Sequence, residues 1–165
     1  MNPLDTQRLF LDCPYAVHQD GNEYTFKTDS DIVYAVDFKE ESAFDPIPAY
    51  WFDLTNRTHR PSPNDPKVRE TVIRIITEFF RVNPDIMLYM CDSANDQQAQ
   101  RNRLFLRWFT GAKQSELYFI KTALVMDDQM ENFIAIIVPR QHPNLAEIVA
   151  HFDEEIAMFQ KVKPQ

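Results

Sequence analysis

Apolar and polar residues alternate along the first third of the chain, which is the pattern of β-strands with one buried face. Residues 23–28 and 32–38 each place their larger apolar side chains on one face, and a turn-forming Asp29-Ser30-Asp31 sequence separates them. A further segment, residues 49–56, is apolar on both faces. The pattern predicts a β-hairpin with one wet face, followed by a third strand.

Three later segments repeat their apolar residues every three or four positions, which is the period of a helix with one buried face. The first covers residues 66–82, with Asp65 as its capping residue and Pro66 in the first helical position. The second covers residues 94–109, and the third begins at the capping sequence Asn144-Leu145-Ala146-Glu147. These segments predict three helices.

Two continuous apolar runs, residues 86–91 and 133–138, indicate strands that are covered on both faces. Residues 117–126 and 132–138 are predicted to form a second hairpin. The predicted element order is therefore βββαβαββα. We expect a single α+β domain over residues 1–165, in which three helices pack on a mostly antiparallel sheet.

The composition is that of a folded intracellular protein. The chain has 165 residues, 44% of them apolar, and no apolar run reaches the about 18 residues that a membrane span needs. Its first residues lack the apolar stretch of a secretory signal, and its two cysteines, Cys13 and Cys91, lie far apart in sequence. We therefore expect a cytoplasmic protein with reduced cysteines.

The net charge of −8 is unevenly distributed along the chain. Residues 57–107 contain nine Lys and Arg against six Asp and Glu, a local charge of +3, so the remainder carries −11. An acidic protein is a poor general binder of nucleic acids or anionic lipids, and we expect neither a nucleic acid nor a membrane as a partner. The basic middle is either a solvated helix face or the binding site of a single anionic ligand.

Several chemistries are excluded by the residues that the chain lacks. Neither of its two glycines, Gly21 and Gly111, opens a strand-to-helix turn, which excludes the glycine-rich loops that bind phosphates. Its four histidines are scattered, and no two share a helix face at metal-binding spacing, so no metal site is expected. Cys91 lies in a buried apolar run and is interpreted as a core residue.

The best candidate for a binding site is a set of polar residues on faces that the helical period turns toward the core. Gln98, Arg101 and Asn102 lie within the inward arc of the second predicted helix, and Arg69 shares the apolar stripe of the first. An arginine that faces a core needs a partner, because an unpaired buried charge is costly. Arg69 and Arg101 form a structural network with Asp92 or another carboxylate, bind an anionic ligand in a pocket, or extend their charged ends to solvent. The sequence leaves these alternatives open.

Three motifs carry a resemblance to a known family. They are Asp65-Pro66-Lys67-Val68-Arg69, Cys91-Asp92-Ser93, and Arg101-Asn102-Arg103-Leu104-Phe105 followed by Trp108-Phe109. The whole chain resembles members of a family of small, uncharacterised bacterial proteins. This resemblance implies a shared fold and an intracellular location, and it implies no activity.

A second and partial resemblance concerns the element order over residues 32–138. In the second predicted helix, Asn95, Ala99, Leu104 and Phe105 echo a motif of the GCN5-related N-acetyltransferases. Those enzymes have a glycine-rich pyrophosphate loop before their first helix, where this chain has residues 61–66, which contain three prolines. The resemblance implies acyl-coenzyme A as a cofactor.

Two functional hypotheses follow. The leading hypothesis is a non-catalytic cytoplasmic binding or protein-interaction domain without a cofactor, because no catalytic motif is found and 21 aromatic residues are available to cover a partner surface. Its partner would be another protein or a second copy of the chain. The alternative is a degenerate or divergent N-acetyltransferase-like protein that depends on an acyl-coenzyme A.

Overall fold

A computed structural model describes residues 1–92, 107, 109, 111, 116–127 and 129–162. The chain forms two compact units, each made from two separate stretches of sequence. Unit 1 consists of Met1–Glu40 and Tyr50–Pro84, and unit 2 consists of Glu41–Ala49 and Asp85–Gln165. The short stretch Glu41–Ala49 therefore belongs to unit 2, although both of its neighbours in sequence belong to unit 1.

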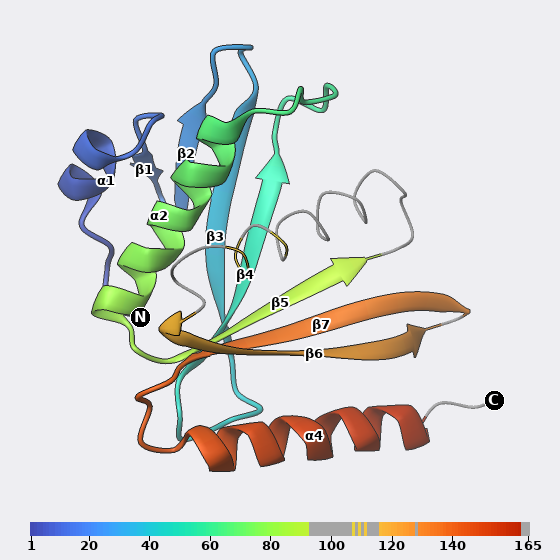
Figure 1. Cartoon of the computed structure of the whole chain (residues 1–165). Helices are drawn as coiled ribbons and strands as arrows, with labels where there is room; N and C mark the ends of the chain where they lie inside the picture. Colours follow the sequence, from blue (N-terminus) through green and yellow to red (C-terminus); the bar gives the residue numbers. More distant parts are fainter. Residues whose placement is uncertain (93–106, 108, 110, 112–115, 128, 163–165) are drawn as a thin grey trace. The chain divides into compact units, whose positions relative to one another are not determined.

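Unit 1 combines a small sheet with two helices (Figure 1). In chain order its elements are α1 (Thr6–Asp12), β1 (His18–Asp20), β2 (Glu23–Lys27), β3 (Val33–Glu41), β4 (Ala49–Asn56) and α2 (Pro66–Val82). The strands follow one another in the order β1-β2-β3-β4, and β2 pairs antiparallel with both β1 and β3. The predicted hairpin and third strand are confirmed.

An aromatic cluster fills the core of unit 1 between α2 and the sheet. Phe79 of α2 has no exposed surface, and its ring stacks on Phe38 of β3 with the ring centres 4.4 Å apart. Tyr50 of β4 meets the same ring edge-on at 5.6 Å. On β2, Tyr24 and Phe26 are 2% and 1% exposed. The alternation in the sequence is therefore explained by a sheet face that packs against α2.

The helix over residues 66–82 has the predicted bounds, but Arg69 does not face the core. Asp65 caps the helix by accepting a hydrogen bond from the backbone N of Lys67 at 2.9 Å. Ile73, Ile76 and Phe80 on the predicted stripe are buried, whereas Arg69 is exposed. The expectation that Arg69 points inward was wrong, because the first turns of α2 bury Val68 and Thr71 instead and Arg69 lies beside that buried face.

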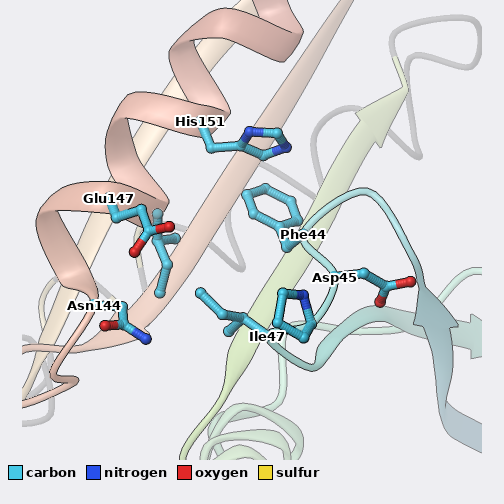
Figure 2. A pocket seen from close by; sticks show the side chains of 8 residues that line it. Phe44, Asp45, Ile47, Asn144, Glu147 and His151 are labelled. Atoms are coloured by element: carbon cyan, nitrogen blue, oxygen red, sulfur yellow. The ribbon is translucent and has the colours of Figure 1, made fainter.

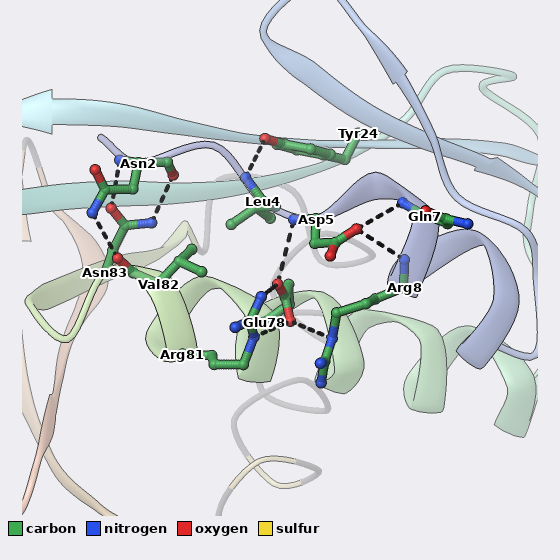
Figure 3. Close-up of polar contacts among 10 residues, drawn as sticks. All are labelled: Asn2, Leu4, Asp5, Gln7, Arg8, Tyr24, Glu78, Arg81, Val82 and Asn83. Atoms are coloured by element: carbon green, nitrogen blue, oxygen red, sulfur yellow. Dashed lines mark hydrogen bonds and ion pairs between the residues drawn. The ribbon is translucent and has the colours of Figure 1, made fainter.

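The first residues of the chain, which showed no pattern in the sequence, are fixed to α2 by polar contacts (Figure 3). Asp5 caps α1 by accepting hydrogen bonds from the backbone N of Gln7 and Arg8, at 3.1 and 3.2 Å. The backbone N of Asp5 donates at 3.3 Å to Glu78, a carboxylate that is only 5% exposed. Arg81 and Arg8 pair with the same carboxylate at 2.6 and 3.5 Å.

Asn83, which ends α2, fixes the same segment at a second point (Figure 3). Its Oδ1 accepts from the backbone N of Asn2 at 2.7 Å, and its Nδ2 donates to the carbonyl of Asn2 at 3.0 Å. The Asn2 side chain in turn donates to the carbonyl of Val82 at 2.8 Å. Asn83 is 1% exposed, so these reciprocal bonds satisfy a buried amide and bind the first residues to the end of the helix.

Glu78 should make unit 1 sensitive to acid. Burial opposes ionisation of this carboxyl, but the hydrogen bonds from Arg81 and Asp5 and the charges of Arg81 and Arg8 outweigh it and lower the pKa below the usual 4.5. A lowered pKa adds stability that is complete above the unfolded-state value and is lost as the pH falls through the folded-state value. We therefore expect Glu78→Gln to cost about 1–2 kcal/mol at neutral pH and to weaken the acid dependence of stability.

Urea unfolding at neutral pH and at pH values down to about 3 measures both effects. Glu70→Gln is the matched control, because Glu70 lies on the same helix, is 55% exposed and pairs with Arg74 one turn away. We expect the control to change the free energy of unfolding by less than about 0.5 kcal/mol. An unchanged acid dependence in Glu78→Gln would contradict the assignment.

Unit 2 is a three-stranded antiparallel sheet with a long helix (Figure 1). Its elements are β5 (Ile86–Asp92), β6 (Tyr118–Asp127), β7 (Met130–Pro139) and α4 (Leu145–Val162). The strand order is β5-β7-β6, and β7 pairs antiparallel with both neighbours. Ala135, Ile136, Ile137 and Val138 of β7 have no exposed surface, as the continuous apolar run predicted.

Helix α4 lies along this sheet and is bound to it by apolar and polar contacts. Ile148 and Phe152, one turn apart, are 1% and 2% exposed. Lys121 of β6 pairs with Asp153 at 2.6 Å, and the side chain of Gln160 donates to the carbonyl of Leu124 at 3.1 Å. Ile148 and Phe152 therefore mark the buried face of α4 in its first turns.

The α+β class and the mostly antiparallel sheet are confirmed by these elements. Two of the three predicted helices are present as α2 and α4, whereas α1 and β1 were not predicted. The helix predicted over residues 94–109 falls outside the described residues, except at positions 107 and 109. The single domain over residues 1–165 stays a prediction. In the described part of the chain no helix is long and apolar enough to cross a membrane.

Candidate functional site

The five residues of the predicted polar site lie in different parts of the chain. Arg69 is exposed on α2 in unit 1. Asp92 ends β5 in unit 2, where its backbone pairs in register with Asn132. Gln98, Arg101 and Asn102 lie outside the described residues. Whether these residues form a structural network or a ligand site therefore stays open.

Cys13, one of two cysteines in the chain, is buried directly after α1. Burial raises its pKa to about 11; Asp12 and Glu70 act in the same direction, and Arg74 opposes them. The thiol is thus protonated at neutral pH and is suited to packing rather than to nucleophilic attack. Among the described residues, no group of three or more His, Cys, Asp or Glu side chains is placed to hold a metal ion.

A pocket of about 300 Å³ lies within unit 2, between the loop at residues 44–47 and the first turns of α4 (Figure 2). Phe44, Pro46, Ile47 and Ile148 supply its apolar walls. Its polar lining consists of Asp45, Asn144, Glu147 and His151. We call it the α4 pocket.

The loop side of the α4 pocket is shaped by two turns in succession. The backbone N of Asp45 donates to the carbonyl of Ser42 at 3.0 Å, and that of Ile47 donates to the carbonyl of Phe44 at 2.9 Å. The Asp45–Pro46 peptide bond is cis. The loop then joins the sheet, since the carbonyl of Pro48 accepts from the backbone N of Ile86 at 3.2 Å. These bonds turn Phe44 inward, where it is 7% exposed.

The helix side is positioned by the start of α4. The helix begins directly after Asn144, as predicted, and the backbone N of Ile148 donates to the carbonyl of Asn144 at 2.9 Å. Ile148 is buried in the pocket wall, whereas Asn144 and Glu147 are exposed at its mouth and His151 lies one turn further along. Figure 2 shows the Glu147 carboxylate on the helix wall and the Asp45 carboxylate pointing away from α4.

His151 joins the two walls. Its Nε2 lies 2.6 Å from the carbonyl oxygen of Ala43, and its ring meets the ring of Phe44 edge-on with the centres 5.2 Å apart. Glu155 approaches Nε2 at 3.4 Å, and Glu154 approaches Nδ1 at 4.0 Å. The walls are therefore fixed relative to each other before any ligand arrives.

The lining of the α4 pocket suits binding better than covalent chemistry. The described residues that line it include no Ser, Thr, Cys, Tyr or Lys that could act as a nucleophile. Glu147 is exposed to solvent at the mouth, and within the described part of unit 2 no cation pairs with its carboxylate. The pocket thus offers apolar walls and the Glu147 carboxylate, which pairs with no cation among the described residues of unit 2.

A second hollow, of about 570 Å³, lies within unit 1 over α1 and β1. Phe10 and Leu11 border it, and these side chains are 49% and 69% exposed. His18, whose ring meets that of Phe10 edge-on with the centres 5.4 Å apart, is also exposed. The hollow is wider than the α4 pocket and is bordered by side chains that solvent reaches, so we consider the α4 pocket the better candidate site.

Sequence reasoning missed the α4 pocket. The prolines at positions 46 and 48 marked the loop as a break between strands, and His151 follows Ile148 by three residues on the face of the last helix. These signals did not indicate that the two segments, 108 residues apart at the Ala43–His151 contact, lie against each other.

Comparison with known proteins identified the family to which the chain belongs, but no activity of that family is known. Residues 64–154 match the model described as "Family of unknown function (DUF6169)", which covers more than half of the chain. No curated protein matches the chain. The match confirms the resemblance to a family of uncharacterised proteins, and nothing supports the second resemblance, to the GCN5-related N-acetyltransferases.

Proposed function

The chain belongs to the DUF6169 family, whose function is unknown, and we propose that it is a non-catalytic binding domain with the α4 pocket as its recognition site. The observation that carries this proposal is a pocket of about 300 Å³ that combines apolar walls with the Glu147 carboxylate, for which the described part of unit 2 supplies no cation. Ligand pockets typically have this character, with mostly apolar walls and a few polar groups that orient the ligand.

The size and rigidity of the α4 pocket support this proposal. Its volume lies at the lower end of the range for ligand pockets, roughly 300–1,000 Å³, so it suits a group the size of one amino-acid side chain. The two loop turns and the His151 contact with Ala43 fix the walls in advance. Such preorganisation lowers the entropy that binding costs.

Amide chemical-shift titration of the ¹⁵N-labelled protein tests the proposal. The probes are the capped amides of arginine, leucine and glutamate, together with coenzyme A as a polyanion. We expect at least one probe to shift the amides of residues 43–47 and 144–151 in a saturable way. Asn144→Trp, which places a large side chain at the mouth of the pocket, should abolish these shifts.

Asn64→Trp is the matched control, because Asn64 is exposed in unit 1 and does not line the pocket. This variant should bind as the original chain does. If no probe shifts the amides around the pocket, or if Asn144→Trp leaves the shifts unchanged, the α4 pocket is not a binding site and the proposal fails.

A further inference from the structure

The charge around the α4 pocket indicates the class of its ligand, provided that the pocket is the recognition site proposed above. The two segments that form it, residues 41–49 and 140–160, contain six Asp and Glu against one Arg. Of these six, Asp153 is neutralised by Lys121. The start of a helix by itself favours an anion. Here, however, the full negative charge of Glu147 stands at that position and outweighs the partial charge of the helix end.

We propose that the α4 pocket binds an arginine side chain from a basic segment of a partner protein. The methylenes of an arginine would pack against Phe44, Pro46 and Ile47, because long cationic side chains bury their stems along apolar surface. The guanidinium would then donate to the carboxylate of Glu147, and a planar guanidinium matches a carboxylate in a bidentate pair. The carbonyl oxygen of the Asn144 side chain, at the same mouth, is a second acceptor.

A protein segment fits this site better than a free small cation. The pocket holds only one side chain, while Glu154 and Glu155 lie on the exposed surface of α4 beyond it. A segment that carries further lysines or arginines beside the inserted one would meet these carboxylates. Complementary charge of this kind increases the association rate and selects the partner.

The test is a titration of the intact chain with peptides that differ in one group. The first is a capped Gly-Arg-Gly peptide, and the second replaces arginine by citrulline, which has nearly the same shape and no charge. We expect the arginine peptide to bind, and its affinity to fall as NaCl is raised from about 50 mM to about 500 mM. The citrulline peptide should bind at least about fivefold more weakly. A peptide with lysines on both sides of the arginine should bind more tightly than either.

Glu147→Gln should weaken binding of the arginine peptide about three- to fivefold, as expected for the loss of an exposed ion pair. The matched control is Glu116→Gln, which removes an exposed carboxylate of unit 2 that does not line the pocket and should leave the affinity unchanged. Neither residue is buried, so both variants should fold.

The possible results separate this inference from the proposed function. Equal binding of the arginine and citrulline peptides, or binding of the leucine or glutamate probe alone, would overturn the inference while the pocket remains a binding site. Binding of putrescine as tight as that of the lysine-flanked peptide would replace the protein partner by a free diamine. If no peptide or probe shifts the amides of the pocket, both the inference and the proposed function fail.

Discussion

Replacing Phe79 by alanine is expected to lower the free energy of unfolding of unit 1 by about 3–5 kcal/mol. Phe79 has no exposed surface, and its ring contacts those of Phe38, Tyr50 and Phe80. The substitution removes a buried ring and leaves a cavity that α2 and the sheet can close only in part, because both are fixed by their other contacts. Since folded proteins are stable by only about 5–15 kcal/mol, this is a large fraction of the total.

Urea unfolding followed by circular dichroism measures this change as a lower midpoint. Phe10→Ala is the matched control, because the same substitution is made at a ring that is 49% exposed at the border of the unit 1 hollow. We expect the control to lose at most about 1 kcal/mol. Equal losses in the two variants would show that the aromatic cluster is not the centre of the core.

Asn83→Ala should cost about 2–3 kcal/mol and release the first residues of the chain from α2. The variant loses both hydrogen bonds to the backbone of Asn2, and the N–H and carbonyl of Asn2 lose their buried partner. Amide hydrogen exchange should therefore become faster in residues 2–12, while the core strands of unit 1 keep their protection. Exchange measured by mass spectrometry distinguishes this local release from general loss of stability.

Two variants serve as references for Asn83. Asn64→Ala makes the same change at an exposed asparagine and should leave exchange in residues 2–12 unchanged. Asn83→Asp keeps the oxygen that accepts from Asn2 but loses the donor, so it should destabilise as well. Faster exchange across all of unit 1 in Asn83→Ala, without a local maximum at residues 2–12, would contradict the assigned role.

Elements with a buried face were predictable because burial imposes a period on the sequence. The strand over residues 49–56 and the helix over residues 66–82 have the predicted bounds. By contrast, α1 has seven residues and buries only Leu9, and all three residues of β1 are exposed. Neither element has a repeating apolar position. Local contacts such as the Asp5 cap determine them, and a period cannot reveal these contacts.

The candidate site was harder to predict than the fold, for two different physical reasons. Arg69 follows the helical period, but the period does not reveal how wide the covered face is at each turn, and here Val68 is buried while its neighbour Arg69 is exposed. The α4 pocket depends on a contact between Ala43 and His151, which are 108 residues apart in the sequence. No local pattern encodes such a contact, so Phe44 and His151 were recognisable as candidates only once the chain was folded.

The division of unit 2 between Glu41–Ala49 and Asp85–Gln165 has a consequence for synthesis on the ribosome. Phe44 leaves the ribosome early, whereas His151, which contacts it in the finished protein, follows about a hundred residues later, on the order of 5–20 s at roughly 5–20 residues per second. Both sequence stretches of unit 1 are complete during this interval, while the loop that carries Phe44 still lacks α4. A nascent chain that stalls there exposes an aromatic side chain to chaperones and proteases, although half of its fold can already be in place.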